Sequence, residues 1–182
     1  PVYWNSEKFH LKTFASYVNL YNVSSDNNAV HGVHQNIEYS ICPSFCGASQ
    51  VSFVNGIITK DGGVHVERFL AELFKTLVQK LNKIKVTAKD LKPYFNIFLN
   101  VKVTNPEFSS QSKTKLVGCK SNLQITIPNK VIQQILKWDF INDIHELHKM
   151  KEMLQLKKSE KKRGFRKIEG LDAANFAGGK QS

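Results

Sequence analysis

The spacing of apolar residues changes twice in the middle of the chain, and this change limits the folds it can adopt. Apolar residues alternate with others in QVSFVNGII (50–58), recur every three or four positions between Val66 and Leu81, and alternate again in FNIFLNVKV (95–103). A period of two is typical of a half-buried strand, and a period near 3.6 is typical of a helix with one apolar face. The pattern predicts strand, helix and strand, with the helix covering one face of a sheet.

Two further alternating runs complete the expected sheet. NIEYSIC (36–42) comes before this region and NLQITI (122–127) follows it. We expect NIEYSIC and QVSFVNGII to pair as a hairpin across CPSFCGAS (42–49), which gives the order β-β-α-β-β. The predicted fold class is α+β, with a four-stranded sheet and helices on one face. The polar face of FNIFLNVKV is then free to meet solvent or a ligand.

Helical spacing also occurs near both ends of the chain. KTFASYVNLY (12–21) predicts a short docked helix, and SSDNNAVHG (24–32) predicts a mobile connection. From Pro128 a helical stripe continues with nothing to break it before Gly164. Seven of the last eleven residues of this stretch, KKSEKKRGFRK (157–167), are basic. We therefore expect one long helix that extends past the core.

Length and charge limit the number of domains and the kinds of partner that the chain can have. A chain of 182 residues with 41% hydrophobic residues can bury one core with an extension. The net charge of +11 is regional, because residues 75–167 carry 21 basic and 7 acidic side chains. Such a region attracts polyanions such as nucleic acid, although a solvated lysine surface that keeps the protein soluble remains open.

The chain has no long apolar run and no signal-peptide layout, so we expect a soluble segment without a membrane partner. Three cysteines are too few and too unevenly placed for a disulfide framework, which favours a reducing compartment. The start PVYWNS and the Gly-rich end ANFAGGKQS suggest a piece of a longer protein.

Two clusters could bind a metal, but neither is predicted to do so. His31, His34, Cys42 and Cys46 have spacing that could ligate zinc, yet such cysteines more often pack as small hydrophobes. His145 and His148 lie one helical turn apart and are expected to face solvent. No serine or cysteine has a base at motif spacing, so no catalytic residue is predicted.

The stretch FSSQSKTKL (108–116) follows an expected strand and contains two lysines in a polar loop. Taken alone, Lys113 and Lys115 are ordinary exposed lysines. Four stretches in order, however, resemble the transducer domain of the eukaryotic-type type IIA DNA topoisomerases. They are YWNSEKFHLKTFASYVNLY, QVSFVNGIITKDGGVHVERF, NPEFSSQSK and LDAANFAGGKQS. The transducer domain links the ATPase domain of those enzymes to their DNA-cleaving core.

The resemblance implies a sheet similar to domain 2 of ribosomal protein S5. It also implies an entry segment from the ATPase domain at 1–22, a transducer domain at 23–138, a long basic helix at 139–167 and a linker towards the metal-binding cleavage domain at 168–182. Gln111, Ser112 and Lys113 take the place of the family's Gln-Thr-Lys loop and would contact the ATP γ-phosphate.

The resemblance further implies a cavity for duplex DNA. Lys83 matches a clustered position of the family, and we extend the DNA-binding set to Lys80 and Lys85. A second basic stretch could touch DNA or only solubilise a linker: Lys157, Lys158, Lys161, Lys162 and Arg163. The intact enzyme would use ATP and Mg²⁺, act as a homodimer in the nucleus and contain the ATPase and cleavage domains in the same chain. The fragment alone would bind no cofactor and be inactive.

Two alternatives stay open. A free-standing basic α+β domain that binds RNA or DNA would share this element order, but it would have no reason to end in LDAANFAGGKQS. A related transducer from a mismatch-repair or chaperone ATPase would carry the lysine loop without that linker.

Overall fold

The computed structural model describes residues 2–21, 29–44, 46–81, 86–120 and 123–162. Its main sheet has five strands in the order β3-β4-β7-β5-β6. The strands are β3 (Val30–His34), β4 (Ile37–Pro43), β5 (Ser49–Val54), β6 (Ile57–Ile58) and β7 (Phe95–Val101). Only the β5–β7 pair is parallel, so the sheet is mixed.

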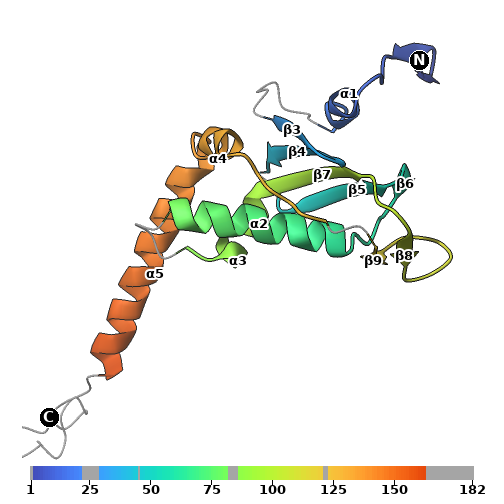
Figure 1. Ribbon diagram of the computed structural model, residues 1–182. Coiled ribbons are helices and arrows are strands. Elements are labelled where there is room, and N and C mark those ends of the chain that lie inside the picture. Colours follow the sequence, from blue (N-terminus) through green and yellow to red (C-terminus); the bar gives the residue numbers. More distant parts are fainter. Residues whose placement is uncertain (1, 22–28, 45, 82–85, 121–122, 163–182) are drawn as a thin grey trace, which may run out of the picture. The chain divides into compact units, whose positions relative to one another are not determined.

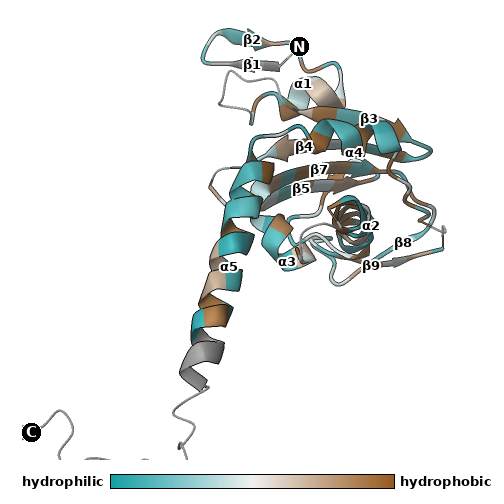
Figure 2. Ribbon diagram, turned by 90° about the vertical axis from the view of Figure 1, so that its left-hand side faces the viewer, coloured by the Kyte–Doolittle hydropathy of each residue, from teal (hydrophilic) through white to brown (hydrophobic). Residues whose placement is uncertain are grey.

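Helix α2 (Val64–Lys80) covers one face of this sheet (Figures 1 and 2). Its apolar stripe buries Phe69, Leu73 and Leu77 against alternate residues of the central strands, including Ile97 and Leu99 of β7. The change of period from two to 3.6 and back therefore corresponds to β5, α2 and β7, as predicted.

A second helix covers the opposite face, which corrects the expectation of helices on one face only. In α1 (Phe14–Val18), Val18 is fully buried beside Phe98 and Cys42. The ring of Tyr17 lies 5.5 Å from that of Phe53, measured between centroids. Phe98 lies on the face of β7 that was expected to meet solvent or a ligand. Because α1 packs on Phe98, this face is partly covered.

The expected hairpin between NIEYSIC and QVSFVNGII is wrong, although both runs form strands. β7 lies between β4 and β5 and pairs with both. Val101 of β7, for example, lies opposite Ile37 of β4 and opposite Val54 of β5. β7 is buried on both faces, which suits a central position in the sheet. The hairpin partner of β4 is β3 and not β5. Residues 30–32 of the expected mobile connection belong to β3, while its residues 24–28 lie outside the described residues.

The predicted fourth strand, NLQITI, is also wrong over its described residues. Residues 123–127 are extended without strand pairing, yet Leu123 and Ile127 are buried in the core. Alternate burial requires only that an extended segment lie against the core, so the pattern cannot distinguish it from a paired strand. The expected four-stranded sheet is therefore corrected to a five-stranded mixed one. Its similarity to domain 2 of ribosomal protein S5 stays a prediction.

Two small hairpins and further short helical segments also belong to the first part of the chain. A hairpin of β1 (Val2–Trp4) and β2 (Glu7–Phe9) precedes α1. Helix α3 (Ala88–Leu91) and the 3-10 turn η1 (Lys92–Tyr94) lead into β7. After β7, β8 (Pro106–Phe108) and β9 (Leu116–Cys119) form the second hairpin.

The expected continuous C-terminal helix is interrupted. Helix α4 (Asn129–Ile135) ends before a short turn, and α5 (Phe140–Lys162) begins after it. The turn directs Trp138 and Phe140 inward, where their ring centroids lie 5.8 and 5.2 Å from that of Phe95. Burial of these aromatic rings explains the break, which the apolar spacing alone did not show.

The chain divides into two compact units, which are residues 1–145 and residues 146–182. In the second unit, the α5 residues Leu147, Met150 and Leu154 are exposed. Residues 163–167 of the expected helix lie outside the described residues. Of the helices in the described parts, none has the length and apolar character needed to cross a bilayer.

Candidate functional site

Residues 109–115 connect β8 to β9 and contain all three residues predicted to contact phosphate. Gln111, Ser112 and Lys113 are exposed. The loop is folded on itself, since the amide of Lys113 donates to the carbonyl of Ser110 at 3.0 Å and the hydroxyls of Ser110 and Ser112 lie 2.7 Å apart. An amide, a hydroxyl and an ammonium are thus presented together on one short turn.

Lys113 has the least common backbone conformation in the loop. Its φ angle is +56°, a left-handed value that few non-glycine residues adopt. The ammonium lies 6.0 Å from the ring centroid of Phe108, within reach of a weak cation–π contact. Within the described part of the chain, no carboxylate forms an ion pair with Lys113. The cation is therefore available to an anionic ligand.

The end of the loop is held by the turn that begins α2. The amide of Asp61 donates to the carbonyl of Thr114 at 2.9 Å, and the amide of Leu116 donates to the carbonyl of Gly62 at 3.0 Å. Gly63 and Leu116 also form an isolated parallel bridge. The Gly-Gly turn of TKDGG therefore connects the lysine loop to the first residue of α2.

Asn55 holds Val103, which lies between β7 and the β8–β9 hairpin. Its side-chain amide donates to the carbonyl of Val103 and its oxygen accepts from the amide of Val103, each at 2.9 Å. Sequence reasoning placed Asn55 in an alternating strand and missed this role. Asn-Gly between apolar residues is typical of a two-residue hairpin turn, and Asn55 and Gly56 both have positive φ. This pattern predicts the turn between β5 and β6 but not the contact with Val103.

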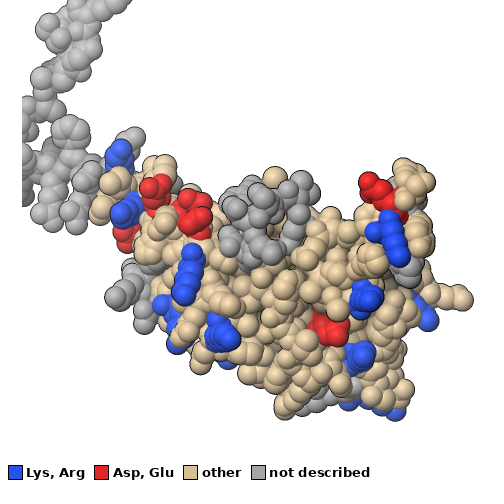
Figure 3. Space-filling view, turned by 90° about the horizontal axis from the view of Figure 1, so that it is seen from above, with Lys and Arg blue, Asp and Glu red and all other residues tan. Residues whose placement is uncertain are grey.

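The predicted DNA-binding lysines are only partly described. Lys80 is exposed in the last turn of α2, whereas Lys83 and Lys85 lie outside the described residues. In the second basic stretch, Lys157 is exposed on α5. The side chains of Lys158, Lys161 and Lys162, and all of Arg163, are not described. On the face shown in Figure 3, basic side chains are scattered, with uncharged surface and acidic side chains among them.

The two candidate metal clusters have other contacts. The imidazole Nδ1 of His31 is hydrogen-bonded to the hydroxyl of Ser40, its partner across β3 and β4. Cys42 is buried under α1, whereas Cys46 is exposed. His148 lies 3.7 Å from the carboxylate of Glu152, one turn further along α5. Among the described residues, no three histidine, cysteine or acidic side chains gather as metal ligands would.

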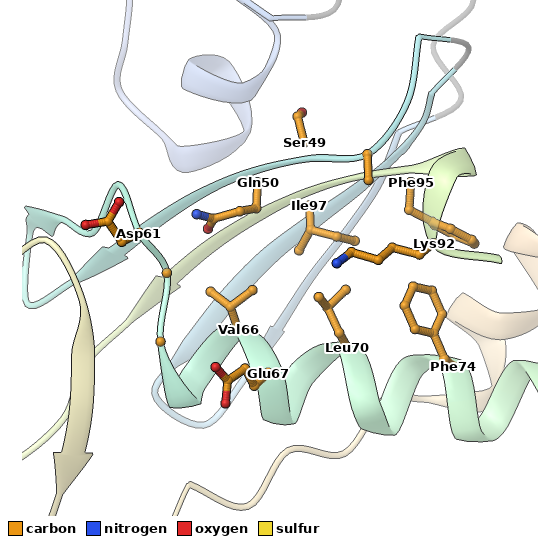
Figure 4. A pocket seen from close by; sticks show the side chains of 13 residues that line it. Ser49, Gln50, Asp61, Val66, Glu67, Leu70, Phe74, Lys92, Phe95 and Ile97 are labelled. Atoms are coloured by element: carbon orange, nitrogen blue, oxygen red, sulfur yellow. The ribbon is translucent and has the colours of Figure 1, made fainter. Parts of the chain in front are cut away.

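A cavity of about 300 Å³ lies between α2 and the strands β5 and β7 (Figure 4). Its floor is apolar, and Lys92 extends across it towards Ile97 and Leu70. Gln50 donates its side-chain amide to the carbonyl of Lys60, while its own amide oxygen is buried without a partner. Asp61 and Glu67 also line the cavity.

Comparison with known proteins agrees with the fold. A family model described as DNA gyrase B matches residues 8–167. The chain is 30% identical to DNA topoisomerase 2 of Invertebrate iridescent virus 6, over 97% of this chain and 17% of that protein. It is 30% identical to DNA topoisomerase 2 of Drosophila melanogaster, over 100% of this chain and 14% of that protein.

Among solved structures, the ATPase region of Saccharomyces cerevisiae topoisomerase II matches with a TM-score of 0.71 and 28% identity. That match covers 79% of this chain and 39% of the yeast chain. The ATPase and transducer domains of Balamuthia mandrillaris topoisomerase II match with a TM-score of 0.65 and 21% identity, over 75% of this chain and 37% of that chain, and support the fold.

The mixed sheet and these similarities therefore define a domain homologous to part of the ATPase region of type II topoisomerases. The chain belongs to the DNA gyrase B family. It spans less than a fifth of the length of the two relatives named above.

Proposed function

We propose that this chain is the transducer domain of an ATP-dependent type II DNA topoisomerase. In this proposal it couples γ-phosphate contact and ATP hydrolysis to the passage of one DNA duplex through a double-strand break in another. The observation that carries the proposal is the exposed loop 109–115, whose base is fixed to the start of α2. The proposed domains are those expected from the sequence, with 23–138 as the transducer.

The loop has a donor set that suits a terminal phosphate. A lysine ammonium forms charge-assisted hydrogen bonds with phosphate oxygens, and the amide of Gln111 and the hydroxyl of Ser112 can add neutral ones. The loop contains no carboxylate that could ligate Mg²⁺. ATP and Mg²⁺ would therefore be held chiefly by the nucleotide-binding part of the intact enzyme, which also supplies the base that activates water.

Loss of the γ-phosphate would remove the partner of Lys113. Because the amide of Leu116 is bonded to Gly62 and Gly63 caps α2, movement of the loop would act directly on the start of that helix. Helix α2 has 17 residues, which corresponds to a length of about 25 Å. Its far end carries Lys80 and leads to the basic segment with Lys83 and Lys85. A single rigid helix would thus link the nucleotide contact to the proposed DNA contact.

The remaining assignments belong to the same proposal. The positive residues 75–167 would bind duplex DNA through its phosphates, without sequence preference. Such an enzyme would work as a homodimer in the nucleus, with the ATPase and cleavage domains in the same chain. Replacement of Lys113 in the full-length protein, with ATP-dependent relaxation of supercoiled plasmid as the measurement, tests the proposal.

A further inference from the structure

Three polar side chains are buried together where β5, β6 and the start of α2 meet. Ser52, Thr59 and His65 are each at most 1% exposed. The hydroxyls of Ser52 and Thr59 lie 2.6 Å apart, and the Thr59 hydroxyl lies 3.3 Å from Nε2 of His65. Neither the phosphate contact nor the DNA contact proposed above uses these residues. Burial of polar groups costs free energy unless they are hydrogen-bonded.

Two arrangements of protons satisfy every donor in this cluster, and in both Nε2–H of His65 donates to the Thr59 hydroxyl. In one, the Thr59 hydroxyl donates to the Ser52 hydroxyl, which donates to the carbonyl of Thr59 at 3.1 Å. In the other, the Ser52 hydroxyl donates to the Thr59 hydroxyl, which donates to the carbonyl of Ser52 at 3.1 Å. Either arrangement needs a neutral imidazole and leaves only the acceptor Nδ1 without a partner. The cluster therefore fixes both the side chain and the backbone of Thr59.

The backbone of Thr59 leads directly to the lysine loop. The amide of Gly62 donates to the carbonyl of Thr59 at 3.0 Å and so closes the turn 59–62. The next contacts are those of Asp61 and Gly62 with Thr114 and Leu116, described above. A continuous series of hydrogen bonds therefore runs from His65, through Thr59 and the turn, to the end of the loop that carries Lys113.

We propose that Thr59 and His65 are positioning residues for loop 109–115. They act through the turn 59–62 and touch no ligand themselves. The inference rests on the proposed function for its consequence, because a displaced loop would misplace Lys113 relative to the phosphate. Its structural part, that the cluster holds the loop, can be tested without nucleotide.

The test measures hydrogen exchange in the full-length protein, in peptides that cover 109–119 and 95–101. Thr59→Val keeps the shape and removes the hydroxyl, and Thr59→Ser keeps the hydroxyl. Thr76→Val is the matched control, because the Thr76 hydroxyl donates to the carbonyl of Glu72 within α2. We expect Thr59→Val to accelerate exchange in 109–119 about tenfold, with little change in 95–101. Thr59→Ser and Thr76→Val should resemble the unmutated protein.

If Thr59→Val fails to fold, Ser52→Ala provides a second variant. It removes the hydroxyl of Ser52, which contacts Thr59 on the side away from His65. It should accelerate exchange in 109–119 in the same direction but by less. Unchanged exchange in 109–119 for the folded variants, or an equal increase in 95–101, would overturn the inference. So would failure of Thr59→Ser to restore protection, since that would show that the hydroxyl is irrelevant.

A double-mutant cycle with Lys113→Ala separates this inference from the proposed function. If the cluster acts through Lys113, Thr59→Val should lower the ATP-dependent relaxation rate in the unmutated protein but have no further effect on Lys113→Ala. An equal effect in both backgrounds would contradict positioning through Lys113. If Lys113→Ala alone leaves the rate unchanged, the proposed function fails, and the exchange data alone decide whether the cluster holds the loop.

Discussion

Gly63 lies in direct backbone contact with Leu116, where the start of α2 meets the start of β9. The two residues form a parallel bridge, and a Cβ atom on Gly63 would clash with the carbonyl oxygen of Leu116. Gly63 also has a φ angle of +132°, which side chains rarely permit. The lysine loop and α2 are thus joined at a position where only glycine fits.

The first prediction concerns this contact. Gly63→Ala should lower the free energy of unfolding by about 3 kcal/mol, because it combines a backbone clash with a strained φ angle. Gly56→Ala is the matched control, since Gly56 has φ of +80° but open space around its Cβ position. It should cost about 1 kcal/mol, from backbone conformation alone. Urea unfolding measures both values, and equal losses would show that the contact with Leu116 adds nothing.

The second prediction concerns pH. Burial lowers the pKa of His65 to about 4, from the usual 6.5. The unfolded chain therefore binds a proton that the folded chain rejects between these values. His65 then favours folding fully above pH 6.5, and this stability is lost as the pH falls towards 4, by about 3 kcal/mol in total.

Urea unfolding between pH 7 and pH 4 measures this loss. Because carboxylates also titrate in this range, the informative quantity is the difference between the unmutated chain and His65→Gln, which cannot be protonated. The variant should be less stable at pH 7 but lose less stability on acidification. Parallel pH profiles of the two proteins would contradict the assignment.

The third prediction concerns DNA. The isolated 182-residue chain should bind duplex DNA weakly and without sequence preference, with affinity that falls steeply from low to moderate salt. Lys80→Ala should reduce the slope of log affinity against log salt by about 0.9 if Lys80 contacts a phosphate. Lys8→Ala, outside the basic region, should leave the slope unchanged. A flat salt response measured by fluorescence anisotropy would count against the assignment.

The fourth prediction concerns nucleotide. The isolated chain should neither bind nor hydrolyse ATP appreciably, because one lysine loop provides only a few contacts to the terminal phosphate. Equilibrium binding of a fluorescent ATP analogue tests this directly. Submicromolar affinity would mean that these residues contain a nucleotide site of their own.

The regular elements were predictable where burial imposed a clear period. Helix α2 and strand β7 follow from the spacing of Phe69, Leu73 and Leu77 and of Ile97 and Leu99, because each buries a continuous apolar face. The pairing of strands was not predictable from these patterns, since apolar alternation does not identify a neighbour. For the same reason, the extended segment 123–127 was mistaken for a strand.

The site was predictable only in part. The exposure of Gln111, Ser112 and Lys113 follows from their polar sequence, and their proposed role came from the resemblance of four motifs to a family. The supports of the loop, Asn55 and Gly63, act through the backbone of residues about fifty positions away. Contacts at that separation depend on the tertiary fold and leave no local spacing in the sequence.

The central claim is that Lys113 senses the γ-phosphate for a DNA-passing enzyme. Its most direct test is ATP-dependent relaxation of supercoiled plasmid by the full-length protein with Lys113→Ala, beside Lys115→Ala as the neighbouring exposed lysine. Loss of a charge-assisted contact should lower the rate about tenfold or more for Lys113→Ala, while nucleotide-free DNA cleavage persists and Lys115→Ala changes little. Relaxation by Lys113→Ala at the unmutated rate, or a larger loss for Lys115→Ala, would contradict the claim.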